Sequence, residues 1–254
     1  MEFKDKVVIV TGAAGGIGIA AARKFAAEGA KLALVDLKRE ALEEAAGDID
    51  GALLLTADVS KEEEVKDYVE RTVEAYGRID VFVNNAGVNG DFKPIEEQTF
   101  ENYQTVLGIN VIGAAMGLKH VVAQMKTQGS GAIVNTASNG GLLGAPGMSA
   151  YVASKHALIG INKSVALEVA GDGIRVNAVC PSGVDTQMMR SIETNARKGH
   201  EDEARKEFEK SVPMGRYAEA DEIADLMLFL ASDKASFITG AYYRIDGGGG
   251  AVSA

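Results

Sequence analysis

Residues 6–18 read KVVIVTGAAGGIG, an apolar run that passes directly into a turn holding Gly12, Gly16 and Gly18. The run does not alternate between apolar and polar residues, which is typical of a strand covered by helices on both faces. Glycine lets the backbone turn tightly and approach a phosphate group, and the N-terminus of a following helix favours an anion. The spacing is Gly-x-x-x-Gly-x-Gly without a following Lys-Ser/Thr, so it is not a P-loop. The stretch predicts a strand, an anion-binding turn and a helix.

Short apolar runs alternate with helical patterns along the rest of the chain. Strands are expected at 6–12, 31–37, 52–57, 79–84, 132–137, 174–180 and 241–245. Helices are expected at 16–28, 39–46, about 60–76, 100–126, 149–170 and 221–230, the third opened by a capping box at Ser60–Glu63. Strands that alternate with helices indicate a mostly parallel sheet covered on both faces. No linker, repeat or low-complexity tract interrupts the pattern, so residues 1–254 are expected to form one domain.

The composition restricts the kinds of function. The chain has 254 residues and a formal net charge of −10, without a basic stripe, which argues against nucleic-acid binding. Its single cysteine, Cys180, excludes an intrachain disulfide and suits a reducing cytosol. The N-terminus lacks a signal-peptide core, and no membrane span is expected. The three histidines are scattered without metal-ligand spacing, so no metal site is expected. The prediction is a cytoplasmic protein that binds neither nucleic acid nor membrane.

Asp36 ends the second expected strand, 24 residues after Gly12. In dinucleotide-binding folds an acidic residue near this place hydrogen-bonds the adenosine ribose. A carboxylate there repels the 2′-phosphate of NADP, and neither the turn nor Leu37 offers a cation to offset that repulsion. Asp36 therefore favours NAD as the cofactor.

Tyr151 and Lys155 lie four residues apart in a helical pattern and so share one face of the helix. A phenol titrates near pH ~10, too high for efficient acid–base catalysis at neutral pH. A nearby ammonium group favours the phenolate and lowers that value. Ser138, at the end of a strand, is placed to hydrogen-bond a substrate oxygen beside the tyrosine.

Taken together, the motifs resemble the short-chain dehydrogenase/reductase family in its common cytosolic form. The matching pieces are Thr11-Gly-x-x-x-Gly-Ile-Gly18, Asp58-Val59, Asn84-Asn-Ala-Gly87, Asn110, Ser138, Tyr151-x-x-Ser-Lys155, Asn177, Pro181, Thr186, Gly215-Arg216, Glu222-Ile-Ala224 and Asp246-Gly-Gly248. The resemblance implies a Rossmann-type, doubly wound, seven-stranded parallel sheet, assembled as a homotetramer or a dimer. It implies an NAD(H)-dependent oxidoreductase that interconverts a secondary alcohol and a ketone by hydride transfer.

The resemblance also implies a role for each matching residue. Tyr151 is the acid/base, Ser138 holds the substrate oxygen, and Lys155 binds the nicotinamide ribose and tunes Tyr151. Asn110 holds a water molecule that links Lys155 to solvent. The cofactor-binding residues are Gly12, Gly16, Ile17, Gly18, Asp36, Leu37, Asp58, Val59, Asn85, Ala86, Gly87, Tyr151, Lys155, Pro181, Val184 and Thr186. Three positions depart from the family pattern: Ser182 and Ala220 replace the usual glycine and proline, and Asn139 replaces a small residue.

The segment after residue 184 differs from the rest of the chain. Between Arg190 and Lys210, 12 of 21 residues are charged, with 6 of each sign. Such a segment is either a solvated surface helix or a mobile lid, here at about 184–213, with Met188 and Met189 facing inward. The residues expected to face substrate are Asn89, Asn139, Leu142, Leu143, Met148, Gly183, Met188 and Met189. This wall is mostly apolar and leaves small secondary alcohols, cyclic ketones, diols and hydroxysteroids open as substrates.

Two other functions stay open at this stage. One is a 3-oxoacyl-[acyl-carrier-protein] reductase, although an acidic carrier would favour a basic docking patch and NAD preference fits oxidation better. The other is a catalytically silent dinucleotide-binding regulator, which the presence of all the catalytic residue types disfavours. A hydrolase is disfavoured because Gly147-Met-Ser-Ala-Tyr151 lacks the last glycine of a nucleophile elbow.

The expected helix 100–126 bears on assembly. Its small residues Gly113, Ala114, Ala115 and Gly117 are expected to let a partner subunit pack closely. We therefore expect a symmetric homo-oligomer, namely a homotetramer.

Overall fold

The structure, a computed structural model, describes residues 1–251; residues 252–254 lie outside the described part. Its centre is a parallel sheet of seven strands in the order β3-β2-β1-β4-β5-β6-β7. The strands are β1 (Val7–Thr11), β2 (Lys31–Asp36), β3 (Leu53–Thr56), β4 (Val81–Asn84), β5 (Gly131–Thr136), β6 (Ile174–Pro181) and β7 (Tyr242–Ile245). The order reverses between β1 and β4, which is the switch point of a doubly wound sheet. The predicted Rossmann-type fold is confirmed.

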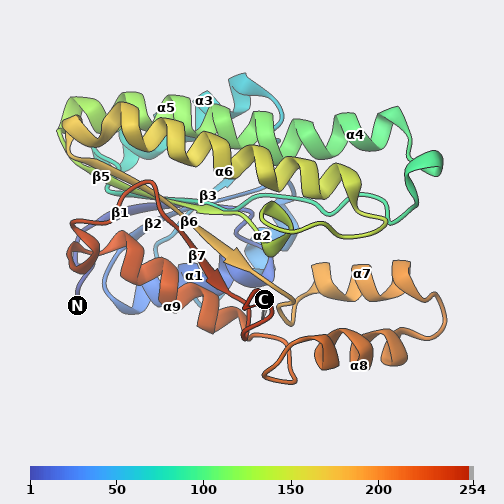
Figure 1. Cartoon of the computed structure of the whole chain (residues 1–254). Coiled ribbons are helices and arrows are strands. Elements are labelled where there is room, and N and C mark those ends of the chain that lie inside the picture. The colour runs from blue at the N-terminus through green and yellow to red at the C-terminus, as the bar shows by residue number, and fades with distance from the viewer. Residues whose placement is uncertain (252–254) are drawn as a thin grey trace.

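Helices cover both faces of the sheet (Figure 1). One face carries α1 (Gly16–Ala27), α2 (Arg39–Ala45) and α9 (Ala220–Ala231). The other carries α3 (Glu62–Tyr76), α4 (Phe100–Leu107), α5 (Ala114–Gln128) and α6 (Ser149–Val169). Two further helices, α7 (Gln187–Ala196) and α8 (Glu201–Ser211), pack together beyond the carboxyl end of the sheet. The carboxyl ends of the parallel strands therefore open into a space between these two helices and the body of the fold.

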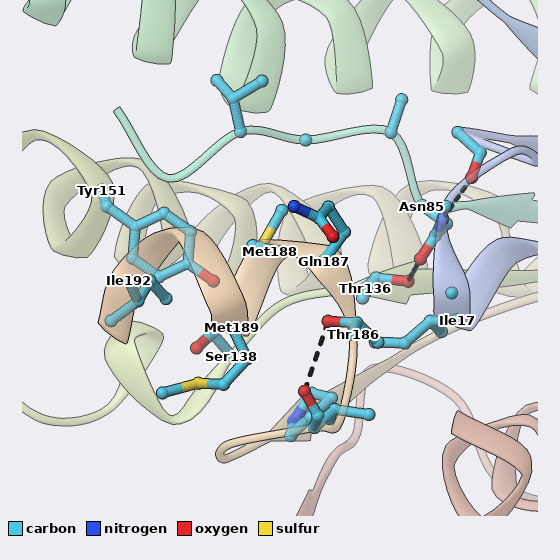
Figure 2. Close-up of a pocket in the computed structure, with 18 of the residues that line it drawn as sticks. Ile17, Asn85, Thr136, Ser138, Tyr151, Thr186, Gln187, Met188, Met189 and Ile192 are labelled. Carbon is cyan, nitrogen blue, oxygen red and sulfur yellow. Dashed lines mark hydrogen bonds between the residues drawn. The ribbon is translucent and has the colours of Figure 1, made fainter. Parts of the chain in front are cut away.

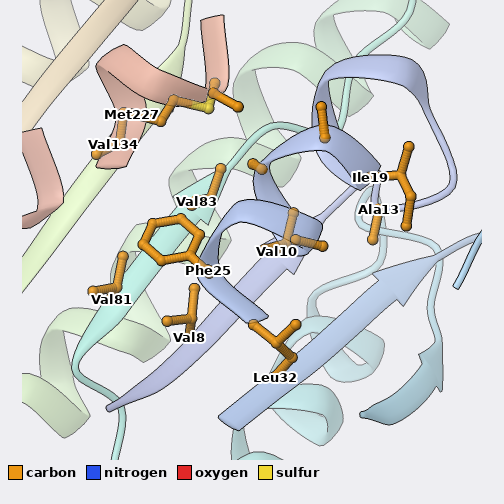
Figure 3. Packing of buried hydrophobic residues seen from close by; sticks show 14 of the residues in the cluster. Val8, Val10, Ala13, Ile19, Phe25, Leu32, Val81, Val83, Val134 and Met227 are labelled. Atoms are coloured by element: carbon orange, nitrogen blue, oxygen red, sulfur yellow. The ribbon is translucent and has the colours of Figure 1, made fainter. Parts of the chain in front are cut away.

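The core explains why the strands carry continuous apolar runs. Val8, Val10, Val81 and Val83 of the central strands are buried and pack under α1 and α9, as Figure 3 shows. Phe25 of α1 is fully buried in the same layer. Because side chains alternate between the two faces of a strand, the intervening residues form a second core beneath α3, α5 and α6. The central strands are thus fixed from both sides and hold the loops that follow them in place.

The expected helix 100–126 is not one uniform helix. A π-helical segment, Gly108–Gly113, separates α4 from α5. Single π turns inside α-helices are frequent at functional sites. This one holds Asn110, whose side chain is buried. The insertion turns Asn110 toward the end of β4, where the site forms.

Two local predictions are wrong. Ser60 does not cap α3: the helix begins after Lys61, and the Ser60 hydroxyl instead donates to Asp58 Oδ1. A capping box is instead found at the start of α9. The Glu219 side chain accepts a hydrogen bond from the Glu222 N–H, and the Glu222 side chain accepts one from the Glu219 N–H. A second correction concerns the small residues of α5, because most of them face the core of their own chain. A side chain at Gly117 would strike Phe82, and one at Gly113 would strike the Val59 carbonyl.

The helical run Phe100–Gln128 is, within residues 1–251, the one long and apolar enough to cross a membrane, with a mean hydropathy of 1.6 over its most apolar window. Length and composition are its sole support for that role. In the fold α5 packs against α3 and α6 over the sheet. A core helix of this kind passes the same test, so the run is weak evidence for a membrane span.

Candidate active site

A cavity of about 730 Å³ lies at the carboxyl ends of β1, β2, β4, β5 and β6. The glycine turn and Asp36 border one end, and Ser138, Tyr151 and α7 border the other. Nearly all the residues expected to bind the cofactor line this cavity; the exception is Gly18, which lies beneath the turn. Ligands of open α/β sheets bind in the crevice at this edge. The cavity is therefore the candidate active site.

The turn after β1 leaves room for a phosphate group. Gly12 has a φ of +63°, a conformation that favours glycine, and a Cβ there would lie 2.9 Å from the Ala86 Cα. A Cβ at Gly16 would lie 2.5 Å from Thr186 Cγ2, whereas one at Gly18 would strike the Gly12 carbonyl. The first helical turn thus presents bare backbone to the cavity. This cradle fits a dinucleotide pyrophosphate.

Asp36 joins the end of β2 to the glycine turn. Its Oδ2 accepts a hydrogen bond from the Ala14 N–H at 2.9 Å, and its Oδ1 accepts one from the Leu37 N–H at 2.7 Å. Each carboxylate oxygen keeps a free lone pair for a further donor. The carboxylate lines the cavity, so it is placed to accept ribose hydroxyl groups.

Thr11 and Asn85 hold the loop after β4. The Thr11 hydroxyl accepts hydrogen bonds from the backbone N–H groups of Asn85 and Ala86, at 3.0 and 3.1 Å. The Asn85 amide donates to the carbonyls of Thr11 and Gly12 and accepts from the Thr136 hydroxyl. Asn85 therefore fixes the geometry of the cavity wall through three strands. The Thr11 contribution is a positioning role that the sequence analysis missed.

The reactive end of the cavity holds two hydroxyl groups. Ser138 follows β5 and Tyr151 lies in the first turn of α6, and both side chains line the cavity. Figure 2 shows the two hydroxyls on the same side of the pocket, with Met189 and Ile192 of α7 beside them. Burial raises the pKa of the Tyr151 phenol, and the hydrogen bond from Ser138 offsets part of that rise. A substrate oxygen between these hydroxyls would meet a donor on each side.

Lys155 lies one turn further along α6, as the spacing predicts. Its Nζ donates to the Thr136 carbonyl at 2.8 Å and lies 5.7 Å from the centroid of the Tyr151 ring. Burial lowers the pKa of Lys155 to about 8. The pKa of Tyr151 is raised, whereas the sequence analysis expected Lys155 to lower it. The reason is that desolvation of the phenol outweighs the other contributions.

Asn110 is placed behind Lys155 and not on the cavity wall. Its side chain bridges the backbone of Val88, accepting from the N–H and donating to the carbonyl, both at 2.8 Å. A Cβ at Gly87 would lie 3.2 Å from Asn110 Oδ1 and 3.5 Å from Lys155 Nζ. The π-helical segment thus brings Asn110 close to the Lys155 ammonium group, behind the cavity wall.

The charged segment after β6 forms a pair of helices tied together by ion pairs. Asp185 binds Arg190 and Arg205, each at 2.8 Å. The two guanidinium groups lie 5.6 and 5.4 Å from the ring centroid of Tyr217, whose hydroxyl donates to Glu193 Oε1 at 2.8 Å. Much of the charge is therefore internal to the helix pair, and Tyr217 lines the cavity. Other lining residues that the sequence analysis missed are Gln187, Ile192, Phe208 and Val212.

The eight residues expected to face substrate divide into two groups of four by their place relative to the cavity. Met148, Gly183, Met188 and Met189 line the cavity. Asn89, Asn139, Leu142 and Leu143 do not line it. Asn89 donates to the Ser191 hydroxyl and Asn139 to Asp246, while Leu142 packs into a side cluster of the core and Leu143 is exposed. Their hydrogen bonds and packing within the chain turn these four side chains away from the cavity.

The remaining candidates for chemistry are the single cysteine and clusters of metal-ligating side chains. Cys180 is a buried free thiol whose pKa burial raises to about 11, in line with a core residue. Within residues 1–251 no group of three or more metal-ligating side chains comes together. Ser138, Tyr151 and Lys155, which line the cavity beside the glycine turn, are therefore the candidates for its chemistry.

Comparison with known proteins agrees with this geometry. Residues 12–249 match the family described as enoyl-(acyl carrier protein) reductase. Levodione reductase of Leifsonia aquatica is 42% identical, with 97% of this chain and 95% of that protein covered. A crystal structure of levodione reductase superposes with a TM-score of 0.97 at 41% identity, covering 99% of this chain and 100% of that chain.

Two further proteins are similar over nearly their whole length. Meso-2,3-butanediol dehydrogenase of Serratia marcescens is 39% identical, with 98% of this chain and 96% of that protein covered. The crystal structure of an NAD⁺-bound xylitol dehydrogenase superposes with a TM-score of 0.93 at 39% identity, covering 98% of this chain and 100% of that chain.

Proposed function

The chain belongs to the short-chain dehydrogenase/reductase family and is an NAD(H)-dependent oxidoreductase of secondary alcohols and ketones, and we propose that Ser138, Tyr151, Lys155 and Asn110 carry its chemistry. One observation carries this proposal. The hydroxyls of Ser138 and Tyr151 lie on the same side of the cavity, and the Lys155 ammonium is 5.7 Å from the centroid of the Tyr151 ring.

The residues divide the work of alcohol oxidation. NAD⁺, when bound, supplies the hydride acceptor. Ser138 donates a hydrogen bond to the substrate oxygen, and the Tyr151 phenolate removes the proton from that oxygen as the carbonyl forms. Lys155 stabilises the phenolate by its charge. In ketone reduction Tyr151 returns the proton to the oxygen.

The cofactor would lie along the cavity from Asp36 to Thr186. The bare backbone at Gly12 and Gly16 would hold the pyrophosphate, and Asp36 the adenosine ribose. The Asp58–Val59 pair would border the adenine, and Asn85–Gly87 the nicotinamide ribose. Val184 and Thr186 would hold the carboxamide, with Pro181 as the adjoining wall.

Replacing Tyr151 with phenylalanine tests the proposal. The ring and its packing stay, while the proton-transfer group is lost, so turnover should fall by about 10²- to 10⁴-fold. NADH binding, followed by fluorescence titration, should stay within about twofold of wild type. Wild-type turnover in Tyr151→Phe on the preferred alcohol would refute the assignment.

The substrate end favours a small uncharged alcohol or ketone. Ala145, Met148, Met188, Met189 and Ile192 give it an apolar wall. In the described lining the charged groups are Asp36, Asp58 and Lys155, all assigned to the cofactor or to Tyr151. The names of the relatives, a butanediol and a xylitol dehydrogenase, agree with such a substrate. A carrier-protein substrate would need a basic docking surface, which the net charge of −10 does not favour.

We further propose that residues 1–254 form one domain with a lid at 184–213, and that four copies assemble into a homotetramer. The acidic composition supports a cytoplasmic protein that binds neither nucleic acid nor membrane.

A further inference from the structure

Asn139, which directly follows the proposed catalytic Ser138, faces away from the cavity toward the C-terminal end of the chain. Its Nδ2 donates to Asp246 Oδ2 at 3.0 Å, a contact between residues 107 positions apart in sequence. Asp246 lies just after β7 and is 9% exposed. A partly buried, charge-assisted hydrogen bond of this kind is stronger than one between neutral groups.

Asp246 is itself fixed in place. Its carboxylate accepts hydrogen bonds from the Gly248 N–H at 3.1 Å and the Gly250 N–H at 2.8 Å. Burial opposes ionisation of this carboxyl, but the hydrogen bonds from Asn139, Gly248 and Gly250 prevail and lower its pKa. The Arg244 guanidinium closes the same loop on the Gly250 carbonyl. The loop 246–250 is therefore wound around an ionised carboxylate.

The other side of the bond is the turn that carries Ser138. The Ser138 hydroxyl accepts from the Gly140 N–H at 3.0 Å, and its carbonyl accepts from the Gly141 N–H at 2.9 Å. A Cβ at Gly140 would lie 3.2 Å from the Tyr151 ring, and one at Gly141 would lie 2.8 Å from the Lys155 carbonyl. The turn is thus pressed against α6, so a small rotation about Asn139 would shift Ser138 relative to Tyr151.

The orientation of the Asn139 amide is set by charge. Its Oδ1 is buried without a hydrogen-bond partner in the described chain. The opposite orientation would place this oxygen against the Asp246 carboxylate, which offers no donor, and is therefore worse. The observed orientation leaves the amide oxygen without a partner but keeps the hydrogen bond from the amide nitrogen to the Asp246 carboxylate.

We propose that Asn139 and Asp246 act as a positioning pair, through which the C-terminal loop holds Ser138 in register with Tyr151 for proton transfer. This inference rests on the proposed catalytic roles of Ser138 and Tyr151. The pair touches neither substrate nor cofactor, so its loss should lower kcat without weakening dinucleotide binding. A misplacement of the order of 1 Å costs about 10²-fold in rate.

A reciprocal exchange tests the pair. Asn139→Asp opposes two carboxylates and should lower kcat about 10- to 100-fold, while the NADH dissociation constant stays within about twofold of wild type. Asp246→Asn removes the charge and should also lower kcat. The double variant Asn139→Asp/Asp246→Asn restores an amide–carboxylate bond in reverse, although the new amide nitrogen at position 246 faces the Gly250 N–H, so kcat should recover in part, to above that of either single variant.

Controls separate this idea from a general loss of structure and from failure of the proposed function. Asp50→Asn, the same change at an exposed turn, should leave kcat unchanged. Asn139→Ala keeps the turn without opposing charges and should lower kcat, even if Asp246→Asn does not fold. Wild-type kcat in Asn139→Asp, or no recovery in the double variant when both single variants fold, would overturn the pairing. Tyr151→Phe, assayed in parallel, reports separately on the proposed catalytic site.

Discussion

At the scale of single residues, burial shifts the pKa values of Tyr151 and Lys155 in opposite directions. Burial raises the pKa of the phenol and lowers that of the ammonium group to about 8. Because the groups are coupled, loss of one proton leaves either a neutral pair or a phenolate beside an ammonium. The second form is the one that can accept a proton from an alcohol.

The pH dependence of both reaction directions follows from this pair. Oxidation needs the Tyr151 phenolate, and burial raises the pKa of that phenol, so kcat/KM for the alcohol should rise with pH into the alkaline range. Ketone reduction needs the protonated phenol and should fall over the same range. In Lys155→Met the phenol loses its ammonium neighbour, which favours the phenolate, so the rising limb should move to higher pH than in the wild type. Steady-state rates between pH 6 and 11 measure this, and an unmoved limb in the variant would contradict the coupling.

Asp36 should set the choice of dinucleotide. Asp36→Asn keeps an acceptor for the ribose and removes the charge that repels a 2′-phosphate, so the preference for NAD over NADP should narrow by at least about tenfold, or about 1.4 kcal/mol. Asp36→Ala also removes the bond to the Ala14 N–H and should weaken binding of both dinucleotides. The ratio of kcat/KM values with the two cofactors is the measurement. A wild type that uses NADP as well as NAD would contradict this role of Asp36.

Residue-level prediction worked where a motif is short and local. The residues of the glycine turn and Asp36 follow strands that the sequence marks plainly, and Tyr151 and Lys155 share a helix face by spacing alone. Asn89 and Asn139 were harder, because an amide next to a motif gives no sign of its partner. Their partners, Ser191 and Asp246, lie about a hundred residues away in the chain. A single sequence does not reveal such pairs.

At the scale of elements, the helix expected at 100–126 shows what periodicity misses. A π turn adds one residue to a helical turn and rotates everything after it, yet the apolar pattern on each side still looks helical. Gly113 and Gly117 consequently face the sheet and not a partner. The helices α7 and α8 could be foreseen as a charged segment, but not how Asp185, Arg190 and Arg205 would pair around Tyr217.

The proposed lid is joined to the loop after β4 by a hydrogen bond whose role can be tested. Asn89, in the loop after β4, donates to the Ser191 hydroxyl of α7 at 3.0 Å. A hydrogen bond of this kind contributes about 0.5–1.5 kcal/mol. Its removal in Asn89→Ala or Ser191→Ala should favour the open lid and raise the KM for substrate about 2- to 10-fold. Steady-state kinetics on each variant measure the change.

A double-variant cycle distinguishes this shared hydrogen bond from separate effects. Asn89→Ala/Ser191→Ala should be no worse than either single change, because both remove the same bond. Thr194→Ala, on the exposed side of α7, is the matched control and should keep the wild-type KM. Additive effects of the two single changes would mean that the residues act independently.

At the scale of the whole molecule, the doubly wound sheet was predictable because its seven strands are short, apolar and evenly interleaved with helices. The reversal of strand order between β1 and β4 then puts the loops after these strands at one crevice, as the motifs require. The sheet leaves β7 at an edge, paired on one side with β6. An edge strand exposes unpaired backbone groups and usually needs cover.

The surroundings of β7 lead to the last prediction. Leu167 at the end of α6 is 85% exposed, Phe237 before β7 is 102% exposed, and Tyr242 of β7 is 42% exposed. Apolar side chains beside an open sheet edge are expected at a symmetric contact between copies. Covering Leu167 or Phe237 would contribute about 1.5–3 kcal/mol per side chain, and a twofold contact counts each one twice. We therefore expect Leu167→Glu/Phe237→Glu to sediment as a smaller species than the proposed wild-type tetramer at micromolar concentration, while still binding NADH. Ala27→Glu, at the exposed end of α1, should leave sedimentation unchanged. A wild-type monomer, or a double variant that still sediments as the tetramer, would place the assembly contacts elsewhere and leave the β7 edge open in solution.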